Sequence, residues 1–153
     1  MIDFKELEKV NSTKEVIKDV FGVDLDIDGG WGYNASTAVI INSLSMPIEQ
    51  FLNLFATVRA NIEMNLTLEK DDRYGGINIS IEKHIQTKID DVTYDVVTCN
   101  IKAMKEDIYA KFIKEYKDGY GKKEFDLSGH FNKRKDSTIL RVVEFWFDGL
   151  KES

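Results

Sequence analysis

The sequence predicts an α+β fold: a largely antiparallel β-sheet with helices packed on one face, preceded by an N-terminal helix. Two kinds of pattern lead to this prediction. Apolar and polar residues alternate over residues 23–28 and 77–89, as they do in half-buried strands. Residues 47–58 and 104–116 instead repeat apolar residues at the spacing of amphipathic helices. At this length and with 42% hydrophobic residues, the chain is expected to form a single domain, residues 1–153.

The first predicted element is a helix within residues 1–22, either continuous or broken near Asn11. Ser12 followed by Glu15 is the pattern of an N-cap, in which a hydroxyl oxygen accepts from a free backbone N–H. Gly22 is the expected stop, because glycine readily takes the left-handed conformation that ends many helices.

The remainder reads as a leading strand followed by two β-α-β-β units, residues 36–89 and 92–148. Asp90-Asp91 is the expected two-residue hairpin turn between them. The sequences around the two predicted helices can be aligned with a small offset, which suggests an internal duplication.

Three elements of these units need separate justification. Residues 62–69 alternate strictly, which favours a strand, although the preceding helix could continue into them. Residues 124–131 are expected to form a strand. Residues 138–147 are apolar on both faces apart from Arg141 and Glu144, which places that strand in the middle of the sheet.

The chain is acidic, with a formal net charge of −6, which argues against binding nucleic acid through neutralised phosphates. The charge is uneven: residues 1–40 and 41–99 each carry −4, and residues 100–153 carry +2. Such a field favours encounter with a cationic partner, although solubility alone also explains it. The charged N-terminus and the lack of a long apolar run predict a cytoplasmic protein. One cysteine and two histidines make a disulfide impossible within the chain and a structural zinc site improbable.

Residues 28–36, "DGGWGYNAS", place three glycines in four positions. Gly30 to Ala35 fit G-x-G-x-x-A, but a dinucleotide site needs a helix to follow, and a strand pattern follows here. Asp24, Asp26 and Asp28 fit half of a calcium loop, but Ala35 stands where the bidentate glutamate is required. The alternation of apolar and polar residues over residues 23–28 instead places the three aspartates on the solvent-exposed face of a strand.

The remaining interpretation is a hairpin turn at Gly29-Gly30 that carries Trp31 and Tyr33 on one side. Either both rings pack on the domain's own core, or they form an aromatic patch beside the aspartates. The second alternative provides rigid aromatic side chains surrounded by aspartate carboxylates, an arrangement that suits contact with a cationic protein surface.

Cys99 and His84 are the one pair that suggests nucleophilic chemistry. Regular pairing places them diagonally on adjacent strands, but the apolar phase shifts near Val96-Val97, which indicates a bulge. We expect that bulge to turn Cys99 inward as an inert core residue and to leave His84 solvated on the polar face. The aspartate pairs 71–72 and 90–91 lie in predicted turns, where nothing would raise a carboxyl pKa.

These observations predict a non-catalytic acidic binding protein, most concretely an immunity or antitoxin-type inhibitor of a cationic toxin such as a nuclease. No cofactor and no metal are expected. The predicted partner-binding residues are Asp26, Asp28, Trp31, Tyr33, Asp71 and Asp72. The alternative is a small-molecule-binding protein or enzyme with its site between the two units, using His84, Tyr94 and Arg141. A third hypothesis is a structural subunit of a larger assembly.

Overall fold

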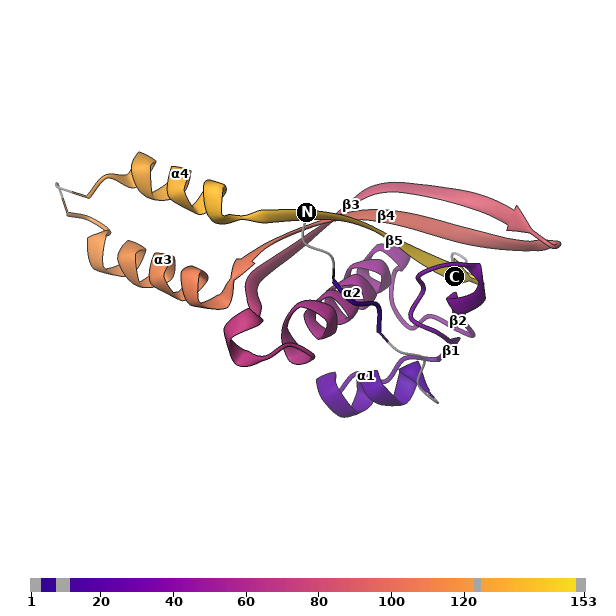
Figure 1. Ribbon diagram of the computed structural model, residues 1–153. Helices are drawn as coiled ribbons and strands as arrows, with labels where there is room; N and C mark the ends of the chain where they lie inside the picture. The colour runs from indigo at the N-terminus through magenta and orange to yellow at the C-terminus, as the bar shows by residue number, and fades with distance from the viewer. Residues whose placement is uncertain (1–3, 8–11, 123–124, 151–153) are drawn as a thin grey trace.

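The computed structural model describes residues 4–7, 12–122 and 125–150, and consists of a five-stranded mixed sheet with four α-helices (Figure 1). The elements in chain order are α1 (Thr13–Phe21), β1 (Ile27–Gly29), η1 (Ala35–Thr37), β2 (Val39–Ile41), α2 (Ile48–Asn61), η2 (Ile62–Leu66), η3 (Lys70–Asp72), β3 (Tyr74–Ile89), β4 (Val92–Lys105), α3 (Glu106–Gly119), α4 (Leu127–Ser137) and β5 (Ile139–Asp148).

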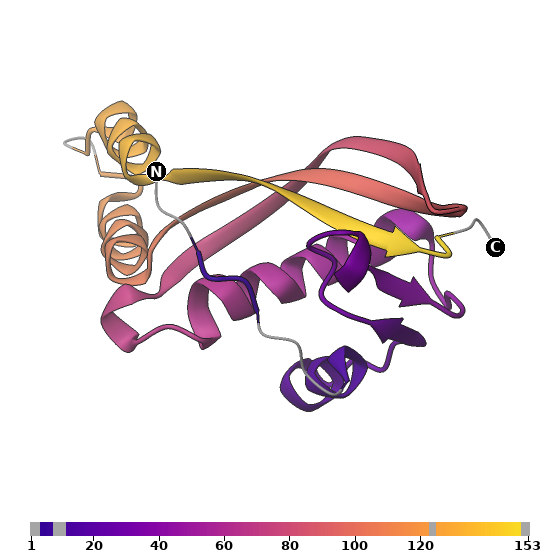
Figure 2. The same ribbon diagram turned by 45° about the vertical axis from the view of Figure 1, so that its right-hand side comes forward.

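The strand order is β1-β2-β5-β4-β3, and β2–β5 is the parallel pair among otherwise antiparallel neighbours. The predicted α+β class, with a helix ahead of the first strand, is confirmed. The last strand, β5, lies in the middle of the sheet as its apolar pattern predicted. Helix α2 runs along one face of the sheet, and α3 and α4 form a helical hairpin at one end (Figure 2).

The main core fills the space between α2 and the sheet. Phe51 and Phe55 of α2 contact Phe145 and Phe147 of β5 through edge-on rings, with centroids 5.7 to 6.3 Å apart. Such edge-to-face pairs add to the free energy gained from apolar burial alone. Because these four rings are at most 1% exposed, α2 and β5 form the rigid base on which the other elements are placed.

The N-terminal helix is shorter than predicted. Residues 4–7 are not helical, and residues 8–11 lie outside the described part of the chain. The cap residues behave as predicted: the Ser12 side chain accepts from Glu15 N–H, and Gly22 ends the helix at φ 70°.

Two segments that were predicted as strands are helical. Residues 62–66 continue α2 as a single wide π-helical turn, in which Ile62, Glu63 and Met64 are all buried. The apolar and polar residues alternate in the sequence, which predicted a strand, but burial does not alternate because three consecutive residues are buried in a helical turn. Residues 127–137 form α4, which begins where the Asp126 side chain accepts from Gly129 N–H. Each predicted β-α-β-β unit therefore has a helical segment as its third element.

The β3–β4 hairpin turns at Asp90 and Asp91 as predicted, with φ angles of 49° and 68°. The bulge was assigned to the wrong strand. The register shifts between Ile81 and Lys83 of β3, not near Val96-Val97 of β4. Ile81 therefore pairs with Cys99, whereas His84, three residues later, pairs with Val97.

The bulge reverses which residues of β3 face α2. Val97 and Cys99 belong to the main core, so their partners His84 and Ile81 lie on the inner face of the sheet. The prediction that His84 shares a face of the sheet with Asn78 and Ser80 is consequently wrong, although its side chain is solvated as predicted, at 39% exposed.

The glycines of residues 29–32 allow close backbone packing. Instead of forming a two-residue turn, Gly29 pairs with Val39, and a nine-residue loop, 30–38, joins β1 to β2. A Cβ on Gly29 would lie 2.3 Å from the Ala38 carbonyl oxygen, and one on Gly32 would lie 3.1 Å from the Trp146 carbonyl oxygen. Both glycines have φ of 86°. The segment is therefore a loop that packs against itself and against β5, and its glycines are required for that packing.

We predict that Gly29→Ala destabilises the protein far more than the matched substitution Gly22→Ala. Both positions have positive φ, so an alanine costs about 1 kcal/mol in backbone strain at either. Only Gly29 has backbone in the way, since nothing lies within 4 Å of a Cβ on Gly22. We expect urea unfolding to show a loss of about 3 kcal/mol for Gly29→Ala and about 1 kcal/mol for Gly22→Ala. Equal losses would contradict the packing role of Gly29.

Candidate functional site

The predicted carboxylates Asp26, directly before β1, and Asp28, within it, lie exposed at the edge of the sheet and are held in place by the chain that follows β2. Asn42 Nδ2 donates to Asp28 Oδ2 at 2.9 Å, and Ser43 Oγ donates to Asp26 Oδ2 at 2.6 Å. The hydrogen bond from Ser43, followed by that from Asn42, holds the pKa of Asp26 below its usual value. Asp26 is therefore anionic at neutral pH, and hydrogen bonds hold both carboxylates in orientation.

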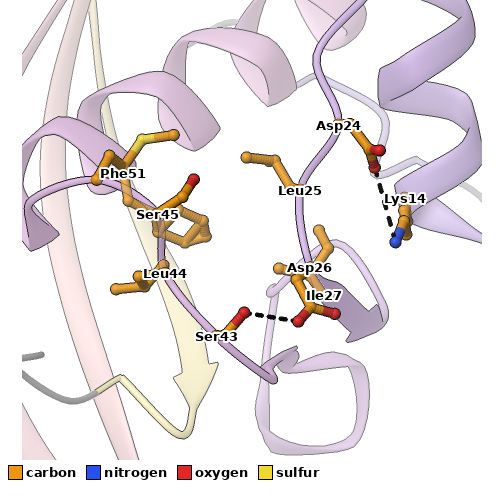
Figure 3. Close-up of a pocket in the computed structure, with 10 residues that line it drawn as sticks. Lys14, Asp24, Leu25, Asp26, Ile27, Ser43, Leu44, Ser45 and Phe51 are labelled. Carbon is orange, nitrogen blue, oxygen red and sulfur yellow. Dashed lines mark hydrogen bonds and ion pairs between the residues drawn. The ribbon is translucent and has the colours of Figure 1, made fainter.

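A small hollow of about 180 Å³ lies beside these carboxylates, between β1 and residues 43–46 (Figure 3). Leu25 and Phe51 contribute apolar surface to it, and Asp26 lies on its wall. Asp24 also lines the hollow and pairs with Lys14, with 3.6 Å between the charged atoms. The hollow thus combines a short apolar surface with the carboxylates of Asp24 and Asp26 and the ammonium group of Lys14.

Asp71 and Asp72 lie at the opposite end of α2, in η3. Both are exposed, and Asp72 Oδ1 lies 3.7 Å from Lys105 Nζ. The structure therefore does not bring the four predicted aspartates together. They form two separate acidic positions, of which β1 carries the better ordered one.

Trp31 and Tyr33 do not form an exposed aromatic patch. Trp31 is 3% exposed and packs against Phe55, so the prediction that its ring is displayed on the surface is wrong. Tyr33 is half-buried; its hydroxyl donates to Glu63 Oε2 and accepts from Leu7 N–H. Because both rings take part in internal packing, the alternative in which they pack on the core is the correct one.

Sequence reasoning missed a buried charged network beneath these rings. The Arg59 side chain is 1% exposed; its guanidinium donates to the carbonyl oxygens of Trp31 at 3.1 Å and Glu144 at 2.9 Å. Glu63 lies one turn later, with 3.7 Å between Arg59 Nε and Glu63 Oε2. Arg141 Nη1 donates to the other Glu63 oxygen at 3.1 Å. We call these residues, together with Tyr33, the Arg59 network.

The network joins four parts of the chain: the loop 30–38, α2 with its π-helical turn, β5 and, through Tyr33, the segment 4–7. The guanidinium carbon of Arg59 lies 3.6 Å from the Phe145 ring centroid and 4.2 Å from that of Tyr33. Burial lowers the pKa of Arg59 and the Glu63 carboxylate opposes this, but a guanidinium stays charged in proteins. The signal in the sequence was an Arg and a Glu spaced i, i+4 among apolar residues.

The three residues of the alternative small-molecule site do not converge. Arg141 belongs to the Arg59 network, and Tyr94 packs edge-on against Trp146 with centroids 5.8 Å apart. His84 binds Asp95 elsewhere on the sheet. The structure therefore gives no support to a small-molecule site formed by these three residues.

The comparisons with known proteins add no family. Neither the protein-family models, nor the curated proteins, nor the solved structures give a match to this chain. No helix in the described ranges has the length and apolarity needed to cross a bilayer. Within the same ranges, no group of three or more His, Cys, Asp or Glu residues is arranged to hold a metal ion.

Cys99 is 1% exposed and belongs to the main core, and burial raises the pKa of its thiol to about 11. We predict that a thiol reagent reacts with the native protein at least 100-fold more slowly than with the urea-unfolded chain at pH 8, because both thiolate fraction and access are low. The native reaction should accelerate up to about pH 11. Equal rates for native and unfolded protein would show that Cys99 is accessible and activated.

Proposed function

We propose that this protein is a non-catalytic acidic binding protein, and specifically an inhibitor of the immunity or antitoxin type that neutralises a cationic toxin such as a nuclease. The observation that carries the proposal is the ordered pair of carboxylates at β1: Asp26, directly before the strand, and Asp28, within it. Their hydrogen bonds to Asn42 and Ser43 fix them before any partner arrives, so little side-chain entropy is lost on binding.

The position of the pair favours a protein partner. Asp28 lies exposed on the edge strand β1, and Asp26 lies exposed directly before it, on the wall of the 180 Å³ hollow. A lysine or arginine of a partner could place its alkyl stem against Leu25 and its charged head against Asp26. The ion pairs of the described residues engage Asp24 with Lys14 and Lys18, whereas they include neither Asp26 nor Asp28.

Electrostatics supply the second argument. The first 99 residues carry a formal charge of −8, so β1 lies in the acidic part of the sequence. A field of one sign raises the association rate with a partner of the opposite sign and weakens as salt screens it. Asp71 and Asp72 would form a second contact only for a partner that reaches both ends of α2.

We predict that reversing both β1 charges, Asp26→Lys with Asp28→Lys, slows association with the cationic partner by about 10- to 100-fold at low salt. The partner for this test is a basic protein that co-purifies with the untagged chain. Stopped-flow association across a salt series, with inhibition of nuclease activity as a second readout, provides the measurement.

The matched control is Asp118→Lys with Asp136→Lys, which makes the same change in net charge on exposed positions of α3 and α4. We expect the control to retain most of the rate. If both double variants slow association equally, net charge rather than β1 determines the encounter. If neither variant nor salt has an effect, electrostatic recognition is wrong.

A further inference from the structure

The outer face of the sheet, which is the face turned away from α2, carries exposed apolar side chains. Among the described helices, α2 lies against the inner face, and none covers the outer face of β3, β4 and β5 (Figure 1 and Figure 2). Directly paired residues share a face of a sheet, so the strand pairing identifies the outward positions. Half of the large hydrophobic residues that are exposed in the described part of the chain lie on this face: Ile40, Ile85, Ile89, Leu140 and Val142.

The centre of the outer face is an apolar cluster on three neighbouring strands. Trp146 of β5 pairs with Val96 of β4, and Val96 pairs with Ile85 of β3. The Tyr94 ring packs against Trp146 on the same face, and Ile85 is 42% exposed. We call Ile85, Tyr94, Val96 and Trp146 the outer cluster. A contiguous apolar surface of this kind, with no helix over it, indicates an interaction site.

Two exposed charges of opposite sign flank the outer cluster. Thr98 of β4 pairs with Glu144 of β5 on one side and with Lys83 of β3 on the other. The side chains of Glu144 and Lys83 form no ion pair or hydrogen bond with another described residue. Within one chain β4 lies between them, so each charge is left available to a partner.

A two-fold axis along β4 brings these charges opposite each other. When a second copy packs on the outer face about this axis, β4 lies over β4, and β5 of each copy lies over β3 of the other. Glu144 of each copy then faces Lys83 of the other, and Trp146 faces Ile85. The outer face is therefore complementary to itself in charge and in apolar surface, as a two-fold interface requires.

The same arrangement separates like charges and leaves β1 uncovered. Lys102 also points outward, but it lies further along β4, where aligned sheets that cross at about 30° have diverged. Strands β2 and β1 lie beyond β5, whereas the second copy extends past β3 on the other side. Asp26 and Asp28 consequently remain accessible in such a dimer.

The size of the outer face indicates a reversible dimer. Three strands about 4.8 Å apart, paired over about ten residues of about 3.4 Å each, cover a planar area of about 500 Å². Stable interfaces bury about 800 Å² of accessible surface on each partner. A face of this size corresponds to the weaker specific interfaces, with a Kd of about 10 to 100 μM.

We propose that the outer face of the sheet is a dimer interface, in which a second copy of this chain packs face to face about a two-fold axis along β4. The outer cluster forms its centre, and the two symmetric Glu144–Lys83 pairs fix its orientation. This interface is independent of the protein-binding role proposed for β1.

Sedimentation equilibrium of the full chain from about 1 μM to about 1 mM tests the proposal, because this range spans the expected Kd. We expect a monomer–dimer equilibrium that Ile85→Asp weakens at least 10-fold, since the substitution places a charge in the outer cluster. The matched control is Val20→Asp on α1, which adds the same charge at a similarly exposed residue, 50% against 42%, and should leave the Kd unchanged.

A charge exchange tests the two-fold arrangement itself. We expect Lys83→Glu to weaken the dimer about 10-fold, because two pairs of carboxylates would then oppose each other. Adding Glu144→Lys to this variant should restore the Kd to within about threefold of the original, since both ion pairs are re-formed with their signs exchanged. Both side chains are exposed, so neither substitution threatens the fold.

A chain that stays monomeric at every concentration would overturn the proposal. So would a dimer that persists in Ile85→Asp, an equal weakening in Val20→Asp, or a double variant that dimerises no better than Lys83→Glu alone. Dimerisation as expected, together with β1 variants that leave association with the cationic partner unaltered, would support the interface and reject only the function proposed for β1.

Discussion

The Arg59 guanidinium is the contact on which the rest of the structure depends. A charge that is almost completely removed from water must be compensated, and Arg59 achieves this through two backbone carbonyls, two aromatic faces and Glu63. One carbonyl belongs to the loop 30–38 and the other to β5, so the same group connects both to α2. The Phe145 ring beneath it is also part of the main core.

The candidate sites follow from this base. Because the loop 30–38 is held against β5, the short strands β1 and β2 extend the sheet, and Asp26 and Asp28 are presented at its edge. The contact between His84 and Asp95 depends on a different constraint, the one-residue bulge of β3, which turns His84 toward Asp95. In both places, backbone geometry away from the charged atoms determines which groups those atoms contact.

The sequence predicts those features that depend on local pattern. The α+β class, the central position of β5, the cap at Ser12 and the turn at Asp90-Asp91 follow from periodicity and local hydrogen bonding. Residues 62–69 were misassigned because alternation over a few residues also fits a buried helical turn. Trp31 could not be placed, since its ring packs on Phe55 and its carbonyl oxygen accepts from Arg59, both of which come much later in the chain.

The candidate sites were predicted less completely for the same reason. Asp26 and Asp28 followed from strand alternation, but their partners Asn42 and Ser43 come from pairing that only the fold establishes. His84 was placed on the wrong face because a shift in apolar phase shows that a bulge exists without showing which strand carries it.

The central role of Arg59 is tested most directly by the free energy of unfolding of the variant Arg59→Met in urea. The account predicts a loss of about 3–5 kcal/mol, because the Trp31 and Glu144 carbonyl oxygens lose their donor and the buried Glu63 loses one of its two cations. A loss below about 1 kcal/mol, the level of an exposed ion pair, would contradict it.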